Sequence, residues 1–354
     1  MDIEKKVISN LTLCYCVAPL RYKDKPHFLV ASEKEYSCLL FDEHGNEVDE
    51  IWKGPGGTMS AVQVPGTDGA FLATHRFYSP NNSKEASIVL CRPVDGGWKV
   101  TTVADLPYVH RFDILQRGGV TYLIACCIKS NYEYKDDWRF PGMTYACELP
   151  DDLLSKPEDY RLPLVLLKDN MLKNHGYSRD IHNGVQTGIV TCDTGVFRFT
   201  PPAERGGEWT IETLITDAAS DAVMVDFDGD GEKELLTLSP FHGDTLRIYK
   251  KSGSGYAPVF EYAKKIEFAH AICGCTICGR NMAIIGYRKG ERELLAVYYL
   301  NGEYVVEVLD RDVGPANVLH SVVDGKDILL SANREINEIA YYTVNSLQSL
   351  ERNV

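Results

Sequence analysis

Short apolar runs, most of which end in a small or polar residue, recur along the whole chain. Seven of them occur, at residues 28–32, 70–74, 121–125, 187–191, 234–238, 281–285 and 327–331. They are mostly about forty to fifty residues apart, which is the length of one repeated supersecondary unit. A chain of 354 residues could hold two ordinary domains or one large closed fold, and this period favours the closed fold.

The segments between these runs also have the pattern of strands. A second strand with outward polar residues follows most of the runs, for example at residues 87–91, 245–249 and 293–298. An edge strand that opens near Gly or Trp comes next, at residues 97–102, 208–212 and 302–307. Four strands in each of seven units predict an all-β fold, a single β-propeller with seven four-stranded blades. Six or eight blades remain alternatives, whereas helical periodicity is too scarce for a helical solenoid.

The two ends of the chain are expected to meet. The last blade runs out of sequence at residues 341–344, and the N-terminal segment 7–15 has the pattern of a strand that completes it. The ring would then be closed by the N-terminal strand, with residues 1–354 in one domain. The longer interval before residue 187 is explained by an insertion at 129–170 in the third blade. Its first part, residues 130–139, is expected to overhang one mouth of the channel as a rim or lid.

Charge and composition exclude several classes of partner. A formal charge of −13 argues against nucleic acid and against an anionic membrane, because both favour a basic face. The N-terminus lacks the apolar core of a signal peptide, and the chain has no apolar run of eighteen or more residues, so we expect a soluble, cytoplasmic protein. The eleven cysteines are expected to be mostly buried, reduced thiols. Cys273, Cys275 and Cys278 have metal-like spacing, but alternation along a strand separates Cys278 from the other two, so a zinc or redox site is disfavoured.

An acidic loop lies between two apolar segments at residues 226–234. It carries Asp226, Asp228, Asp230 and Glu234, with glycines between the last acids. Carboxylates at alternate positions are the oxygen ligands that Ca²⁺ or Mg²⁺ prefers. An EF-hand needs a Glu at loop position twelve, where this chain has Thr237. We therefore expect a β-hairpin closed by a structural cation, with an acidic solvated turn that binds no metal as the alternative.

Six of the nine histidines occupy equivalent places in the repeat. Four precede the apolar runs by seven to twelve residues and are expected where the innermost strands begin, and two come within four residues after such runs. In a propeller these two kinds of position converge on one mouth of the central channel. The six are His75, His110, His175, His242, His270 and His320. Arg76, Arg111, Arg288 and Arg334 map to the same mouth, whereas His27, His44 and His182 fall at other turns and are interpreted as structural.

A group of imidazoles beside arginines suggests a divalent metal or an anionic or polyhydroxylated ligand. Any one histidine here could be a hydrogen-bonded filler, but six together favour a site. About three imidazoles would hold Zn, Mn, Ni or a similar ion with open positions. The catalytic candidates are His110, His175, His270 and His320, with Arg76 and Arg334 as clamps. Tyrosines near the same mouth suit a sugar, whose C–H faces stack on aromatic rings.

The acidic loop is similar to the calcium loops of FG-GAP and VCBS-type repeats. Together with histidines around the channel mouth, it makes the chain resemble the propeller domain of aldos-2-ulose dehydratase. That resemblance implies metal-assisted removal of water from keto-sugars such as 1,5-anhydrofructose. Residues 226–234 are its specific motif, which many propellers share, and the cupin domains of that family are not found in these 354 residues.

These observations lead to a functional hypothesis with two alternatives. The first is a metal-dependent carbohydrate lyase or dehydratase that acts by β-elimination on a keto-sugar or oxidised glycoside. The second is a propeller that binds a glycan or protein without catalysis, and the third is a hydrolase that uses metal-bound water. The sequence leaves the substrate, the metal and the oligomeric state open.

Overall fold

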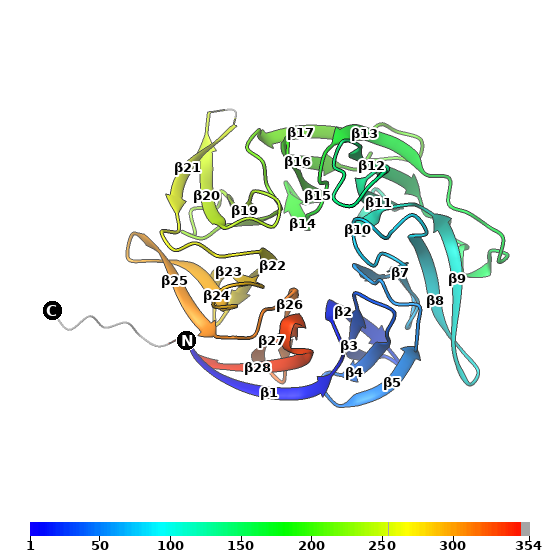
Figure 1. Ribbon diagram of the computed structural model, residues 1–354, viewed down its shortest axis with the longest axis horizontal. Helices are drawn as coiled ribbons and strands as arrows, with labels where there is room; N and C mark the ends of the chain where they lie inside the picture. Colours follow the sequence, from blue (N-terminus) through cyan, green and yellow to red (C-terminus); the bar gives the residue numbers. More distant parts are fainter. Residues whose placement is uncertain (254, 348–354) are drawn as a thin grey trace.

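The computed structural model describes residues 1–253 and 255–347, and it shows seven four-stranded antiparallel sheets around a central axis (Figure 1). The predicted all-β, seven-bladed propeller is confirmed. Within each blade the strands follow one another outward from the channel, so that β2, β6, β10, β14, β18, β22 and β26 line it. We call the end of the channel where these innermost strands begin its upper mouth.

The first four blades account for the chain up to residue 215. Blade 1 is β2 (Cys14–Tyr22), β3 (Lys25–Ser32), β4 (Cys38–Asp42) and β5 (Glu47–Trp52). Blade 2 is β6 (Ala61–Gln63), β7 (Phe71–His75), β8 (Ser87–Val94) and β9 (Gly97–Asp105). Blade 3 is β10 (Val109–Arg117), β11 (Val120–Lys129), β12 (Pro141–Glu148) and β13 (Val165–Met171). Blade 4 is β14 (Tyr177–His182), β15 (Val185–Cys192), β16 (Gly195–Thr200) and β17 (Thr210–Ile215).

The remaining blades have the same order. Blade 5 is β18 (Asp221–Val225), β19 (Glu234–Ser239), β20 (Thr245–Ser252) and β21 (Gly255–Glu261). Blade 6 is β22 (Ala269–Ile277), β23 (Arg280–Tyr287), β24 (Leu294–Leu300) and β25 (Glu303–Asp310). Blade 7 is β26 (Asn317–Val323), β27 (Lys326–Asn333), β28 (Glu338–Ser346) and, from the other end of the chain, β1 (Asp2–Asn10).

The N-terminal strand closes the ring by pairing with β28. The ladder runs from Asp2 opposite Ser346 to Asn10 opposite Glu338. The closing strand lies earlier than the expected segment 7–15, because the chain leaves blade 7 after Asn10 and begins the innermost strand of blade 1 at Cys14. One segment with strand-like pattern throughout therefore serves two blades, and only the pairing shows where it divides.

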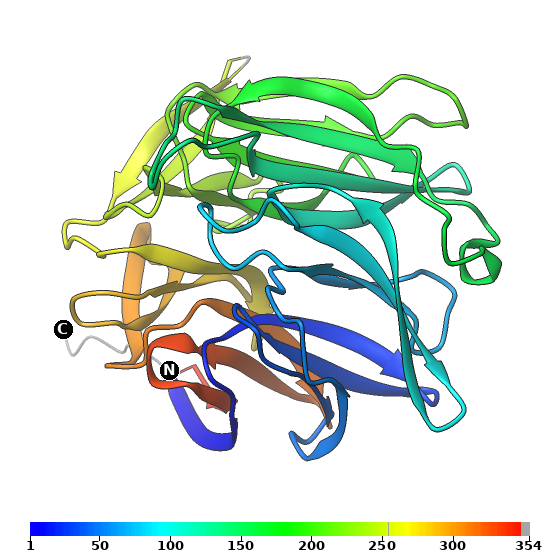
Figure 2. The same cartoon turned by 45° about the vertical axis from the view of Figure 1, so that its right-hand side comes forward.

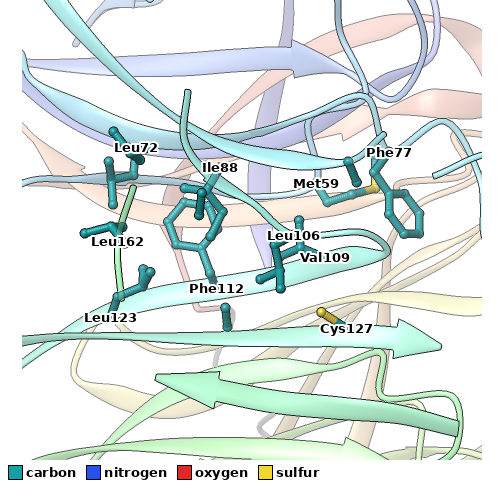
Figure 3. Close-up of a cluster of buried hydrophobic side chains, with 14 of the residues drawn as sticks. Met59, Leu72, Phe77, Ile88, Leu106, Val109, Phe112, Leu123, Cys127 and Leu162 are labelled. Carbon is teal, nitrogen blue, oxygen red and sulfur yellow. The ribbon is translucent and has the colours of Figure 1, made fainter. Parts of the chain in front are cut away.

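The insertion in blade 3 consists of two separate segments. Residues 130–140 connect β11 to β12, and residues 149–164 connect β12 to β13 through a short 3-10 helix, η1 (Leu153–Ser155), at the outer edge of the molecule (Figure 2). Leu162 from the second segment is buried beside Leu72 and Leu123, in the core between blades 2 and 3 (Figure 3). Burying such a leucine contributes about 1.5–3 kcal/mol, so this segment is part of the packed structure.

Two further expectations concern cysteines and membranes. All eleven cysteines are free, and eight of them are buried. Cys273 and Cys275 are partly exposed and Cys278 is exposed. In residues 1–253 and 255–347 no helix is long and apolar enough to cross a membrane. The second 3-10 helix, η2 (Arg334–Ile336), precedes β28.

Candidate functional site

Each blade places one residue at the upper mouth, just where its innermost strand begins. We call these seven residues the mouth ring: Tyr15, Met59, His110, His175, Ser220, His270 and Ala316. In six blades the residue two positions earlier has a positive φ angle: Leu13, Gly57, Tyr108, Lys173, Phe268 and Gly314. This left-handed residue turns the chain from the outer strand of one blade into the channel strand of the next. Because this turn recurs in six blades, the residue two positions after it lies at an equivalent place in each of them.

A β-bulge aims three of these side chains inward. In each of three innermost strands one residue is left without a partner on the neighbouring strand: Tyr15, His110 or His270. In β10, for example, Val109 lies opposite Cys127 and Arg111 lies opposite Cys126, so His110 between them is the extra residue. A bulge re-aims a side chain and increases the local twist, and bulges are frequent beside functional sites. The three rings consequently meet over the channel although they come from blades 1, 3 and 6.

Each ring histidine is fixed by the backbone of the next blade. His110 Nδ1 lies 2.8 Å from the carbonyl oxygen of His175, and His270 Nδ1 lies 2.7 Å from that of Ala316. His175 Nδ1 lies 3.2 Å from the carbonyl oxygen of Ser220 and 3.0 Å from a carboxylate oxygen of Asp221. A nitrogen that faces a carbonyl or carboxylate oxygen must carry the proton. Wherever such a ring is neutral, its Nε2 atom therefore keeps a free lone pair.

The rings of His175 and His270 converge on His242, which extends from the loop between β19 and β20. His242 Nε2 lies 3.3 Å from His175 Nε2, and ligand atoms of His175, His242 and His270 all lie within 4.8 Å of one another. Tyr15 places its hydroxyl 3.0 Å from His270 Nε2 and 3.3 Å from His110 Nε2. Two nitrogen ligands of a tetrahedral Zn²⁺ are about 3.4 Å apart, given Zn–N bonds of about 2.0–2.1 Å. The His175 to His242 separation matches that edge.

The protons available in the cluster do not satisfy its lone pairs. The Nε2 atoms of His110, His175 and His270 need three donors, whereas the hydrogen bonds of the described residues supply two: the Tyr15 hydroxyl and a proton on His242 Nε2. An additional proton on His110, His242 or His270 is disfavoured, because burial lowers the pKa of each ring well below the usual value. Neutral imidazoles with a surplus lone pair are the donor set that a divalent transition metal requires.

Aromatic rings cover the cluster from above. Phe241 and Phe268 stack on the two faces of His242, with ring centroids 3.9 and 4.1 Å away, and Trp138 packs against Phe241 at 5.2 Å. Lys129, whose ammonium donates to the carbonyl of Asp137 at 2.7 Å, lies 4.1 Å from the Trp138 ring. The loop 130–140 thus reaches over the mouth, and His110, His175 and His270 are only 1–2% exposed.

The structure does not bring all six predicted histidines together. His320 lies in the middle of β26 and contacts Asp327 at 2.7 Å, because the tight hairpin that pairs Val323 with Lys326 puts Ala316, not His320, at the mouth. His75 ends β7, but its ring packs against Trp52 at 4.6 Å. His75 and His320 were both expected among the candidate metal ligands, and neither lies in the histidine cluster.

The predicted arginine clamps are engaged elsewhere. Arg76 is exposed and pairs with Glu85 at 3.0 Å. Arg334 pairs with Glu33 and Glu335, and Glu335 also binds Arg288 at 2.8 Å. These arginines connect loops around the rim of the mouth, so neither Arg76 nor Arg334 touches the histidine cluster in the hydrogen bonds of the described residues.

The acidic loop forms the expected hairpin between β18 and β19. Ligand atoms of Asp226, Asp228 and Glu234 lie within 4.8 Å of one another. Among the described residues, Asp226 Oδ1 and Glu234 Oε1 are buried without a hydrogen-bond partner, although Lys250 Nζ lies 3.5 Å from Glu234 Oε1. Burial raises the pKa of Glu234. Lys250 reaches in from β20 and contacts Asp228, and also Asp230 at 2.7 Å. These carboxylates could therefore bind a hard cation such as Ca²⁺ or Mg²⁺. The Lys250 ammonium already neutralises part of their negative charge.

Sequence reasoning missed Tyr15 and Asp221. Both stand where an innermost strand begins, Tyr15 at the bulge of β2 and Asp221 as the first residue of β18. Aligning residues 13–17 with residues 108–112 and 268–272 would have placed Tyr15 opposite His110 and His270.

His75 gives a pH prediction that is independent of the cluster. Burial lowers its pKa to about 4, so the folded state binds its proton less readily than the unfolded state does. Its contribution to stability is present above pH 6.5 and is lost as the pH falls toward 4. We expect the wild-type free energy of unfolding to lose about 2 kcal/mol from this group between pH 7.5 and pH 5. Urea denaturation of wild type and His75→Leu at both pH values measures it, and identical pH dependence in the two proteins would contradict the assignment.

Comparisons with known proteins support the fold and do not extend to function. A scan against protein-family models gave no match, and a search of curated proteins gave none either. Among solved structures, the chain is similar to the β-propeller domain of Cps50 (Swd1) from Myceliophteria thermophila. The TM-score is 0.63 at 9% sequence identity, and the match covers 97% of this chain and 100% of that one. At this identity the similarity shows that the chain is a β-propeller.

Proposed function

We propose that this propeller holds a divalent transition metal at its upper mouth and acts as a metal-dependent carbohydrate lyase or dehydratase. The observation that carries the proposal is the convergence of His175, His242 and His270, whose ligand nitrogens lie within 4.8 Å of one another. The metal, when bound, would act as a Lewis acid on a sugar carbonyl and make the adjacent C–H more acidic. The acidic loop would hold Ca²⁺ or Mg²⁺ in a structural role.

His110 and Tyr15 suit proton transfer in such an elimination. His110 is outside the three-histidine group, is neutral, and has its Nε2 lone pair 3.3 Å from the Tyr15 hydroxyl. It can therefore accept a proton while Tyr15, which burial keeps protonated by raising its pKa, can donate one to a departing oxygen. Asp221 fixes the tautomer of His175, as carboxylates behind metal-binding histidines commonly do.

The burial of the cluster favours a second candidate. Structural metal sites are closed, whereas catalytic sites keep an open position, and the aromatic cover over His242 is typical of a closed site. In this alternative the histidines stabilise the ring and the propeller binds a glycan or a protein without catalysis. The two candidates share the metal and differ in whether His110 and Tyr15 transfer protons.

The test combines metal analysis with a product assay. Purified protein is analysed for metal content, then incubated with 1,5-anhydrofructose and with uronate-containing oligosaccharides while near-ultraviolet absorbance is recorded. Elimination creates an unsaturated, absorbing sugar, and His110→Ala should abolish this signal while retaining the metal. Absorbance that is unchanged in His110→Ala would exclude the assigned base. Bound metal without any product would favour the binding propeller, and absence of metal would overturn both.

A further inference from the structure

The central channel continues below the mouth ring as a water-accessible cavity. A space of about 180 Å³ lies next to the ring and is bordered by Met59, Arg111, Ser178 and Asn317. It joins a larger space of about 520 Å³ toward the lower end, with which it shares Val17, Asp113 and Tyr177 among its walls. The walls of the larger space include residues from the ends of innermost strands, such as Gln116 of β10, so this cavity faces the lower side of the propeller.

Arg111 is the unusual residue in this cavity. It follows the bulged His110, but its side chain turns below the ring, with the guanidinium carbon 5.5 Å from the centre of the Tyr15 ring. One guanidinium nitrogen donates to the carbonyl of Met59 at 2.6 Å, and another to Asn317 Oδ1 at 3.2 Å. A guanidinium has five N–H donors, so three remain after these two bonds. In residues 1–253 and 255–347, no carboxylate lies within salt-bridge distance of Arg111.

The charge of the cavity is therefore uncompensated. Its other charged groups are Arg179 and Asp113, and these pair with each other through Arg179 Nε at 2.9 Å. The remaining polar lining is neutral, including Gln63 and Gln186, which are held by hydrogen bonds to neighbouring backbone. A partly buried cation without a counter-ion is costly, and a bound anion removes that cost. The net charge of the lining is one positive, which matches one carboxylate.

Arg111 is also held in position before any ligand binds. Asn317 donates from its amide nitrogen to the carbonyl of Tyr15 at 2.8 Å, and this contact fixes its oxygen toward Arg111. Met59 belongs to the mouth ring, so both anchors are parts of the rigid propeller. A guanidinium held in this way loses little conformational entropy on forming a bidentate pair with a carboxylate.

We propose that the lower central channel binds a small, singly charged polyhydroxylated acid of the sugar-acid class, with Arg111 as the receptor for its carboxylate. The volume is in the range of small-molecule sites, and amides and hydroxyls of the lining suit the ligand's hydroxyl groups. The walls of the site contain none of the histidines, and the site needs no metal. It is therefore independent of the proposed lyase activity.

The test uses D-glucuronate and its methyl ester in titration calorimetry, on the full chain after treatment with a chelator. The wild-type protein should bind the acid in a saturable way and the neutral ester at least tenfold more weakly, because the ester cannot form the charge-assisted pair with Arg111. Arg111→Gln should lower the affinity for the acid by the same factor, and Arg111→Lys should lose less. Arg247→Gln, on an outer strand where Arg247 pairs with Glu261, is the matched control and should bind like wild type.

Three results would overturn the proposal. They are absence of saturable glucuronate binding to the wild type, equal affinity for acid and ester, or equal affinity of Arg111→Gln and wild type. Circular dichroism and the thermal midpoint of each variant establish that it is folded. Since the chelated protein is used, loss of the metal or of lyase activity leaves this measurement unaffected.

Discussion

Replacing His175 by alanine is expected to abolish the proposed binding of a transition metal at the upper mouth, with a metal affinity at least a hundredfold below that of wild type. His175 occupies the centre of the cluster, since its ring lies beside those of His110, His242 and His270. Loss of one of three imidazole ligands leaves two, and a Zn²⁺ site with two protein ligands is incomplete. Metal content after extensive dialysis, and competition with a chelator of known affinity, measure the change.

Two further variants make this prediction specific. Asp221→Asn keeps the ring of His175 in place but removes the charged partner of Nδ1, and such second-layer changes lower metal affinity about 10- to 100-fold. His320→Ala removes a histidine that lies outside the cluster and should leave metal content unchanged. Wild-type metal content in His175→Ala would show that the metal, if present, is bound elsewhere.

Deleting residues 2–10 is expected to destabilise the propeller by on the order of 4 kcal/mol and to promote aggregation. The deletion removes the ladder between β1 and β28 and the pairing of Lys5 with Asp310 and Glu338. It also turns β28 into a long exposed edge, which is a template for pairing with other chains. Urea denaturation and light scattering of the truncated protein check both effects.

A permuted variant provides the control for this deletion. It begins at Leu11 and carries residues 2–10 after residue 347 through a short turn. Asp2 lies opposite Ser346, so an antiparallel hairpin can restore the same ladder. The permuted protein should recover most of the lost free energy of unfolding. Equal stability of the truncated and wild-type proteins would mean that ring closure contributes little.

Much of the fold was readable from local patterns. Strand periodicity, turn residues and the spacing of apolar runs depend on near neighbours in the sequence, and they predicted seven blades and a terminal strand that closes the ring. The same patterns failed at residues 7–15, because both halves of that segment have strand character. The division between them depends on pairing with β28 and β3, which are distant in sequence.

The candidate site was predicted less completely than the fold. Counting residues back from each apolar run placed His110, His175 and His270 correctly at the channel mouth, since their hairpins have similar lengths. The same count misplaced His320, whose hairpin is shorter, and it gave no information on Arg111. Whether a side chain at the mouth points up, across or down depends on bulges and on packing against other blades.

The sequence by itself determined that this chain is a ring of small sheets with imidazoles near one end and a carboxylate loop near the other, because such positions repeat with the strands. Only the tertiary structure decided that Tyr15 joins the histidines, that His75 and His320 do not, and that Arg111 faces the cavity below without a carboxylate partner among the described residues. The physical reason is that these contacts link different blades. Hydrogen bonds such as that from His110 to the carbonyl of His175 form only when neighbouring blades pack against each other.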